Sequence, residues 1–303
     1  MGEMMVVRTT ENNRPGNVVL LCILSCVVLI SACATQQPVT SPIPSNPTGT
    51  YQVGKFVWFD LLTNDVPGTK RFYGELFNWE FEGTASDNSS YATIKNNDTA
   101  IGGIINLKRL DENVSESRWL SYLSVADVDR SVKQFREAGG TVLKEASDVP
   151  GRGRVAVVKG PQGAILALLR TKGGDPEDRA LTTGAWMWTE LWTSDVMASI
   201  TFYKSLSGFT EETVDTSVGE EYHFLKQADQ IRAGVVPIPW DDVKPNWLPY
   251  IAVSDISSTV ARAEALGGKV LIDPGDSIDD GSIAVIADPS GAAFGIENLP
   301  AEK

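Results

Sequence analysis

The sequence contains one long pattern twice. Residues 57–65 (VWFDLLTND) return 130 positions later as residues 187–195 (MWTELWTSD). Further along, residues 125–127 (VAD) match residues 253–255 (VSD), and the offset is now 128. An offset that changes once, by two residues, indicates a duplicated domain with one insertion or deletion in a loop. The period far exceeds the roughly 20–50 residues of solenoid repeats, so we expect each copy to bury its own core.

The duplication also predicts the domain boundaries. A chain of 303 residues fits about two domains on the usual scale of roughly 100–200 residues each. We expect domain 1 at residues 53–170 and domain 2 at residues 184–298. Between them, residues 171–183 are rich in Gly, Pro and charged residues, a composition typical of a linker.

Each copy repeats one order of elements. In the first copy, an apolar strand at residues 56–62 is followed by a helix that starts after Asp65, with Pro in its first turn. Three short apolar segments with strand composition follow the helix. The order then recurs from residue 119, with a second helix at residues 129–138 ended by two glycines. The prediction is an α+β fold in which each domain is two β-α-β-β-β units that form a half-open sheet around a cleft.

The N-terminus carries an export signal. Basic residues precede an apolar run at residues 18–30, too short to span a bilayer at about 20 residues but typical of a signal-peptide core. The run closes on Ile30-Ser31-Ala32-Cys33, which resembles the bacterial lipobox. We therefore interpret residues 1–33 as a lipoprotein signal peptide, Cys33 as the lipidated residue and residues 34–52 as a flexible tether. The alternatives are an uncleaved anchor or a plain secretory signal.

Composition excludes several functions. The net charge of −13 opposes binding to a phosphate backbone, so we expect no nucleic-acid partner. Two of the three cysteines lie inside the signal core and the third is Cys33. The remaining chain therefore has no disulfide and no thiol nucleophile.

Several ordered features, found in both copies, resemble the vicinal oxygen chelate superfamily, the group of glyoxalases, bleomycin resistance proteins and extradiol dioxygenases. A strand ending in Asp precedes a helix with Phe-Tyr and Leu; a Val-x-Asp then precedes a helix that ends in Gly-Gly. A Pro-x-Gly-Ala turn leads into the last strand of each copy. The resemblance covers about residues 53–170 and 184–298 and implies the fold described above.

The resemblance also implies where a divalent metal would bind in a family enzyme. Such an ion needs about three protein ligands with positions left open. The implied positions are Trp58, Leu120 and Leu169 in the first copy and Trp188, Leu248 and Glu297 in the second. Only Glu297 can coordinate a metal, so we expect no metal cofactor.

Four residues remain as candidate catalytic groups. Asp60 and Glu190 occupy equivalent positions, either as a base or orienting carboxylate in each cleft or as a structural feature kept in both copies. His223 is the only histidine, either a metal ligand or base, or a structural strand residue. An alternative enzyme would use an atypical metal site in domain 2, built from Glu190, His223 and Glu297.

Tryptophans indicate a binding site. Trp58, Trp119, Trp188 and Trp247 lie in predicted strands, where indole rings suit a flat or apolar small molecule. Packing in the core is the alternative for most of them.

The sequence thus predicts a cell-envelope lipoprotein, anchored through Cys33 to the outer membrane and facing the periplasm. We expect metal-independent binding of a small apolar or aromatic molecule, by sequestration as the resemblance to resistance proteins implies. Two alternatives stay open: a metal-dependent lyase, isomerase or dioxygenase, and a structural envelope protein with vestigial clefts.

Overall fold

The computed structural model describes residues 42–44, 46–83, 91–109, 116–215, 221–241, 243–276 and 282–300. The predicted signal peptide, Cys33 and residues 34–41 and 45 of the predicted tether lie outside this part of the chain. Within it, no helix combines the length and the apolar character needed to cross a bilayer.

Domain 1 contains eight strands and two helices in the described ranges. They are β1 (Phe56–Thr63), α1 (Val66–Phe77), β2 (Glu80–Glu82), β3 (Tyr91–Asn96), β4 (Thr99–Asn106), β5 (Arg118–Ser124), α2 (Val128–Glu137), β6 (Thr141–Val149), β7 (Gly153–Lys159) and β8 (Ile165–Thr171), with a 3-10 turn at Leu107–Arg109.

Domain 2 repeats this series over its described residues. Its elements are β9 (Trp186–Thr193), α3 (Val196–Ser207), β10 (Thr210–Asp215), β11 (Glu221–Gln227), β12 (Gln230–Pro237), β13 (Asn246–Val253), α4 (Ile256–Ala265), β14 (Lys269–Ile272), β15 (Ile283–Ala287) and β16 (Ala293–Asn298), with a 3-10 turn at Pro274–Asp276.

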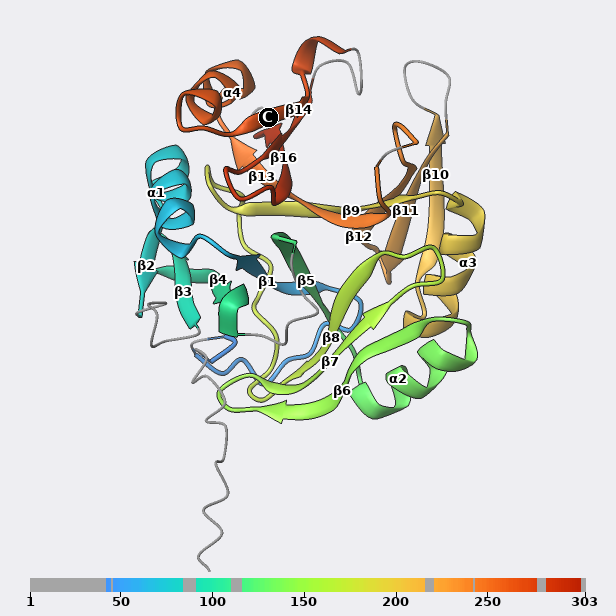
Figure 1. Ribbon diagram of the computed structural model, residues 1–303. Helices are drawn as coiled ribbons and strands as arrows, with labels where there is room; N and C mark the ends of the chain where they lie inside the picture. The colour runs from blue at the N-terminus through green and yellow to red at the C-terminus, as the bar shows by residue number, and fades with distance from the viewer. Residues whose placement is uncertain are drawn as a thin grey trace, which may run out of the picture. The chain divides into compact units, whose positions relative to one another are not determined.

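Each domain forms one eight-stranded sheet (Figure 1). Sheet A has the strand order β2-β3-β4-β1-β5-β8-β7-β6, and sheet B has the order β10-β11-β12-β9-β13-β16-β15-β14. In sheet A the two β-α-β-β-β units join where β1 and β5 pair antiparallel, and in sheet B where β9 and β13 do. The predicted α+β fold, two tandem domains of two β-α-β-β-β units each, is confirmed.

Each helix begins after an aspartate of the repeated pattern. Asp65, Asp127, Asp195 and Asp255 are the N-caps, and each carboxylate accepts a hydrogen bond from the backbone N–H three residues further on. This bond satisfies one of the free amides of the first helical turn. The aspartates that mark the repeat in the sequence therefore set the start of every helix.

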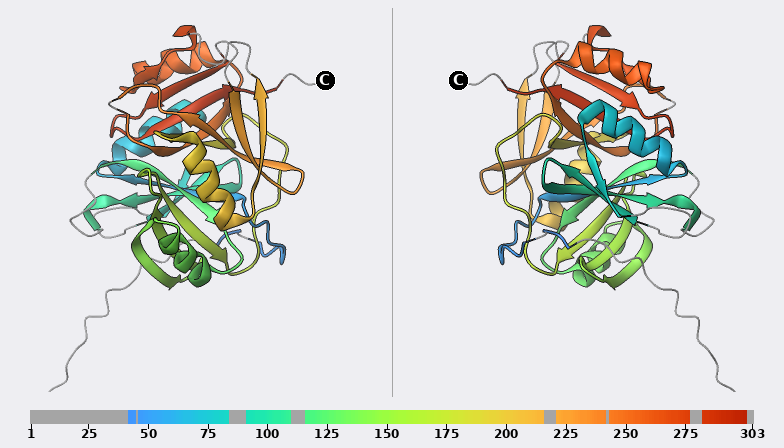
Figure 2. Two further views of the ribbon diagram at one scale, coloured as in Figure 1. Left: turned by 90° about the vertical axis from the view of Figure 1, so that its right-hand side faces the viewer. Right: turned by 90° about the vertical axis from the view of Figure 1, so that its left-hand side faces the viewer.

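The two domains share their cores. Helix α1 packs beside α4, and α2 beside α3 (Figures 1 and 2). One apolar cluster joins the first unit of domain 1 to the last unit of domain 2, and a second cluster joins the two inner units. Buried apolar area is the main stabilising contribution in such a body, so the domains form one packed unit, arranged as in a dimer of the repeat.

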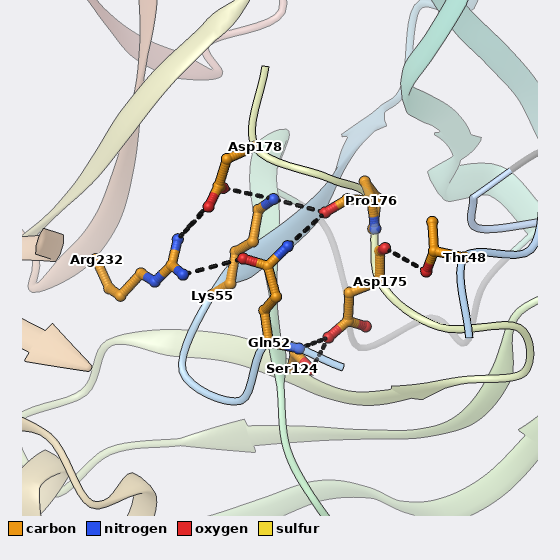
Figure 3. Close-up of polar contacts among 8 residues, drawn as sticks. All are labelled: Thr48, Gln52, Lys55, Ser124, Asp175, Pro176, Asp178 and Arg232. Carbon is orange, nitrogen blue, oxygen red and sulfur yellow. Dashed lines mark hydrogen bonds and ion pairs between the residues drawn. The ribbon is translucent and has the colours of Figure 1, made fainter. Parts of the chain in front are cut away.

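The linker is held in place by polar contacts (Figure 3). The buried carboxylate of Asp175 accepts hydrogen bonds from the Gln52 backbone N–H (2.7 Å) and from the Ser124 hydroxyl (2.6 Å). Asp178 pairs with Lys55 at 2.7 Å and with Arg232 of domain 2 at 3.3 Å. These contacts fix the linker to the segment before β1 and to both domains.

Candidate functional site

Strand alternation gives each sheet two faces. In β1, Phe59 and Leu61 point to the shared core, whereas Trp58 and Leu62 belong to a separate cluster on the other side. We call this second side the inner face of each sheet. It carries Asp60 in sheet A, bonded to Tyr122 of β5, and Glu190 in sheet B, bonded to Tyr250 of β13.

On the inner face of sheet A, Asp60 is the centre of a closed hydrogen-bond network. The carboxylate accepts from Trp58 Nε1 (2.9 Å), from the Tyr91 hydroxyl (3.1 Å) and from the Tyr122 hydroxyl (2.7 Å). It also forms an ion pair with the Arg152 guanidinium, whose Nη2 lies 3.0 Å from Asp60 Oδ1. Both charged side chains are at most 3% exposed, and a buried charge pair needs hydrogen-bond partners of this kind. Of the guanidinium nitrogens, Nε is buried without a hydrogen-bond partner in the described part of the chain.

Aromatic rings enclose this ion pair. The guanidinium carbon of Arg152 lies 4.8 Å from the ring centre of Tyr91, 5.1 Å from that of Tyr122 and 5.7 Å from that of Trp58. These distances are within the range of cation–π attraction. Burial raises the pKa of Tyr122 well above its usual value, and the charge of Asp60 raises that pKa further. The hydroxyl therefore remains a neutral donor.

An isoleucine from the N-terminal segment completes the inner face of sheet A. Ile43 is 1% exposed and belongs to the same cluster as Trp58, Leu120, Tyr122 and Leu169. This part of the predicted tether, residues 42–44 and 46–52, is thus packed against domain 1, because an isoleucine side chain gains free energy when it leaves water. Domain 1 fills its own inner face with Arg152 and Ile43.

On the inner face of sheet B, Glu190 takes the place of Asp60. Its carboxylate accepts from Trp192 Nε1 (2.8 Å), from the Tyr250 hydroxyl (2.7 Å) and from the Tyr222 hydroxyl. Burial raises the pKa of Tyr250 well above its usual value, and the charge of Glu190 adds to this effect. Glu190 and Asp60 therefore each anchor aromatic side chains of their own sheet.

The rings of sheet B are more open than those of sheet A. Trp188, Tyr222 and Phe224 are partly exposed, whereas Trp58, Tyr91 and Tyr122 are buried. The Trp188 ring centre lies 5.9 Å from those of Tyr222 and Phe224 and 6.1 Å from that of Tyr250. The Trp188 indole N–H is buried without a hydrogen-bond partner in the described part of the chain. Such a donor costs about 1–3 kcal/mol until it finds an acceptor.

Glycines make room for two of the tyrosines. A Cβ atom at Gly103 would lie 1.9 Å from the Tyr91 hydroxyl, and one at Gly234 would lie 2.1 Å from the Tyr222 hydroxyl. Real carbon and oxygen atoms cannot approach so closely, so only glycine lets each tyrosine reach its carboxylate.

The predicted domain 2 residues do not all meet. Glu297 lies on β16, next to β13, and its charge raises the pKa of Tyr250, which places it near the Glu190 network. His223 follows Tyr222 on β11 and so points to the opposite face of the sheet. There its Nδ1 lies 3.1 Å from Glu211 Oε1 and 3.3 Å from the Thr213 hydroxyl. The structure thus brings Glu190 and Glu297 to one face and leaves His223 on the other.

Two of the four predicted ligand-binding tryptophans lie in the shared core. Trp119 donates through Nε1 to the Tyr73 hydroxyl, and Trp247 donates in the same way to the Tyr203 hydroxyl, both at 3.1 Å. Both indoles are almost completely buried on the sides of their sheets that face the shared core. They attach α1 and α3 to the sheets, so Trp188 and Trp58 are the two that face the candidate sites.

The described residues do not fit the metal centre that the family resemblance implies. No group of three or more His, Cys, Asp or Glu side chains in the described ranges could hold an ion. The implied ligand positions in sheet B are Trp188, Leu248 and Glu297, of which two have no coordinating atom suited to a divalent metal. We therefore assign no chemical step to a metal.

A separate open groove of about 310 Å³ lies at the start of α2. Its lining includes Val53, Asp127, Arg130, Gln134 and Leu206. The Asp127 carboxylate is already engaged as the helix cap, and the groove is not on either inner face.

With this geometry established, comparisons with known proteins identify the family. The profile of the Glyoxalase/Bleomycin resistance protein/Dioxygenase superfamily matches residues 55–168, and that of a Glyoxalase-like domain matches residues 188–296. A protein of Mycobacterium tuberculosis named "Putative glyoxylase CFP32" is 30% identical over 248 residues, covering 81% of this chain and 95% of its own length. The chain belongs to this superfamily.

Other relatives have different names. The "Anthracycline biosynthesis protein DnrV" of Streptomyces peucetius is 29% identical over 260 residues, with 81% of this chain and 94% of that protein covered. Among solved structures, a Mn(II)-bound glyoxalase from Novosphingobium aromaticivorans aligns with a TM-score of 0.57 at 16% identity, covering 82% of each chain. Homoprotocatechuate 2,3-dioxygenase of Brevibacterium fuscum gives 0.58 at 13% identity, covering 84% of this chain and 73% of the enzyme. These structural likenesses establish the shared fold.

Proposed function

We propose that this protein binds a small apolar or aromatic molecule on the inner face of sheet B, without a metal. The observation that carries the proposal is the contrast between the two inner faces. Domain 1 fills its face with Arg152 and Ile43. Domain 2 offers the partly exposed rings of Trp188, Tyr222 and Phe224. Partly exposed aromatic rings around a few polar groups are typical of small-molecule sites.

The relatives support a small-molecule role of this kind. Two of them are named for anthracycline biosynthesis, and anthracyclines are planar polycyclic aromatic compounds that could stack on indole and phenol rings. An anthracycline is therefore a reasonable second probe, beside a neutral aromatic dye.

Binding can be tested with N-phenyl-1-naphthylamine, a neutral dye whose fluorescence rises in apolar surroundings. We expect one dye per chain, and we expect Trp188→Ala to weaken binding at least about tenfold through loss of ring contact. Trp188→Phe keeps a ring and should retain most of the affinity. Trp58→Phe in domain 1 is the matched control, which should leave dye binding unchanged. Equal loss in the Trp58 and Trp188 variants, or no saturable binding, would contradict the proposal.

We further propose that the protein is a lipoprotein of the cell envelope, anchored to the outer membrane through Cys33 and facing the periplasm. The support is the lipobox-like Ile30-Ser31-Ala32-Cys33 at the end of an apolar run. Lipid chains supply the membrane affinity that such a short run lacks. Fractionation of cells that express the Cys33→Ser variant is the test, and persistence of that variant in the membrane fraction would refute the anchor.

A further inference from the structure

Domain 1 contains an internal example of cation binding. The planar guanidinium of Arg152 pairs with the Asp60 carboxylate and lies within 6 Å of three ring centres, those of Trp58, Tyr91 and Tyr122. The carboxylate compensates the positive charge of the guanidinium and orients its N–H groups. The faces of the aromatic rings attract the cation. This arrangement is a complete recognition site in which the ligand is a side chain of the protein.

Domain 2 repeats the carboxylate and the rings. Glu190 corresponds to Asp60, Trp188 to Trp58 and Tyr250 to Tyr122, at the offsets of 130 and 128 residues that define the duplication. Tyr222 donates to Glu190 from β11, as Tyr91 donates to Asp60 from the corresponding strand β3. The carboxylate and the aromatic rings around it are therefore present in both domains.

The cationic half differs between the copies. The sequence Gly151-Arg152-Gly153 aligns with Asp279-Asp280-Gly281, so an aspartate stands at the position of the arginine. Asp280 lies outside the described residues, and only its identity enters here. In the sequence of domain 2, an acidic residue thus aligns with the one basic side chain of the network in domain 1.

A second carboxylate strengthens the contrast in charge. Glu297 takes the place of Leu169, which is a buried apolar member of the inner face of sheet A. Its charge acts on Tyr250, which donates to Glu190. Around the central carboxylate, sheet A contributes one acid and one base, Asp60 and Arg152, whereas the described part of sheet B contributes the acids Glu190 and Glu297. Nearer the edge, each sheet also carries a paired acid and base on this face, Glu82 with Lys95 in sheet A and Glu212 with Lys226 in sheet B. Two carboxylates close together favour a cation at the same place.

We propose that the site on the inner face of sheet B takes a ligand with a planar or compact organic cation, a guanidinium, amidinium or ammonium group, attached to an aromatic or apolar body. The cationic group lies against Glu190 among Trp188, Tyr222 and Tyr250, as Arg152 lies against Asp60. The body of the ligand contacts the exposed rims of Trp188 and Phe224. This inference rests on the proposed function of domain 2 and adds the charge of the ligand to it.

The test compares phenylguanidine with phenylurea, which have nearly the same shape and differ in charge. Isothermal titration of the full chain, in a buffer without amines, should give one site for phenylguanidine at least about tenfold tighter than for phenylurea, because only the former makes a charge-assisted and cation–π contact. Glu190→Gln removes the charge, keeps the size of the side chain and one acceptor oxygen, and should abolish this preference. Glu297→Gln, at a partly exposed position, should reduce it even if the Glu190 variant fails to fold.

The outcomes separate the two proposals. Equal affinity for both probes, weakened in both by Trp188→Ala, would leave small-molecule binding in place and overturn the cation. Absence of phenylguanidine binding at millimolar concentration would also overturn the cation, while the neutral dye decides the proposed function independently. Stoichiometric Mn(II) or Zn(II) that displaces phenylguanidine would assign the two acids to a metal and overturn the inference.

Discussion

Glu190 occupies in sheet B the place that Asp60 occupies in sheet A, and each carboxylate accepts hydrogen bonds from two tyrosine hydroxyls. One tyrosine lies on the adjacent strand, β5 or β13, and the other lies two strands away, on β3 or β11. The same anchor therefore supports two different inner faces. In domain 1 the anchor carries a guanidinium of the protein itself. In the sequence of domain 2, Asp280 aligns with Arg152. The inner face of domain 1 is filled by side chains of the protein itself, whereas the inner face of domain 2 has partly exposed aromatic rings.

The ion pair in domain 1 predicts a large effect of a single substitution. Arg152→Ala leaves the buried Asp60 charge without its partner, which typically costs about 3–5 kcal/mol of the free energy of unfolding. Urea unfolding should show this loss, and Asp60→Asn in the same chain should recover part of it because the lone charge is gone. Arg154→Ala removes solvent-exposed ion pairs with Asp129 and Asp148 and should change stability little. An Arg152→Ala variant as stable as the parent would mean that the pair does not hold the inner face together.

The N-terminal segment gives a second prediction. Ile43 fills the inner face of sheet A, so Ile43→Ala should lower the free energy of unfolding by about 2–5 kcal/mol, the usual range for a buried large-to-small change. Leu143→Ala, at a residue that is 48% exposed, is the matched control and should have a much smaller effect. If the two variants behave alike, residues 42–44 do not contribute to the folded body.

Much of the fold follows from sequence alone. The repeat predicts two domains, the strand and helix periods predict the order of elements, and the capping aspartates predict helix starts such as Val66. These signals are local, and each is present twice. The location of the linker also follows from its composition, although its buried carboxylate at Asp175 does not, because a Gly-rich and Pro-rich segment gives no sign of its distant partners.

The candidate site could be predicted only in part. The repeat indicates Glu190 and Trp188, and it also pairs Tyr122 with Tyr250 at the offset of 128, whereas Tyr91 and Tyr222 lie 131 positions apart. Arg152 could not be predicted in this way, because its partner in the repeat is an aspartate. The sequence predicts a binding role for Trp119 and Trp247, whereas the structure places both indoles in the shared core. Successive side chains of a strand lie on opposite faces of the sheet. A shift of one residue in strand pairing exchanges the two faces, so the sequence alone does not show which tryptophans lie on the inner face.

Metal removal gives a third prediction, on which the alternative enzyme depends. The described side chains of sheet B offer Glu190, with three hydrogen bonds, and Glu297 as candidate ligands, while His223 lies on the other face. We therefore expect no change in the melting temperature on treatment with EDTA, and no shift with added Mn(II), Zn(II), Ni(II) or Fe(II). Elemental analysis of protein purified without chelator is the direct measurement. One ion per chain, lost in Glu297→Gln, would restore the lyase or dioxygenase alternative.

The fourth prediction concerns pH and Asp288, which lies in the turn between β15 and β16. Its Oδ1 accepts from the backbone N–H groups of Ser290 (2.8 Å) and Ala292 (3.1 Å), whereas its buried Oδ2 has no hydrogen-bond partner in the described chain. Burial raises the pKa of this carboxyl above its usual value. The folded state therefore binds the proton more tightly than the unfolded state, and ionisation of Asp288 disfavours folding.

The sign of the pH dependence follows directly. Below the unfolded pKa of about 3.9, Asp288 is protonated in both states and contributes no penalty. As the pH rises through the window between the unfolded and the folded pKa, the protein loses stability by about 1.4 kcal/mol for each unit that separates them. Asp288→Asn keeps the acceptor at Oδ1 and cannot ionise, so its free energy of unfolding relative to the parent should increase from acid toward neutral pH. Urea unfolding of both proteins between pH 3.5 and 7.5 measures this difference. Because every other titrating group cancels in the comparison, a difference that stays constant or falls with pH would show that the Asp288 carboxylate is not disfavoured in the fold.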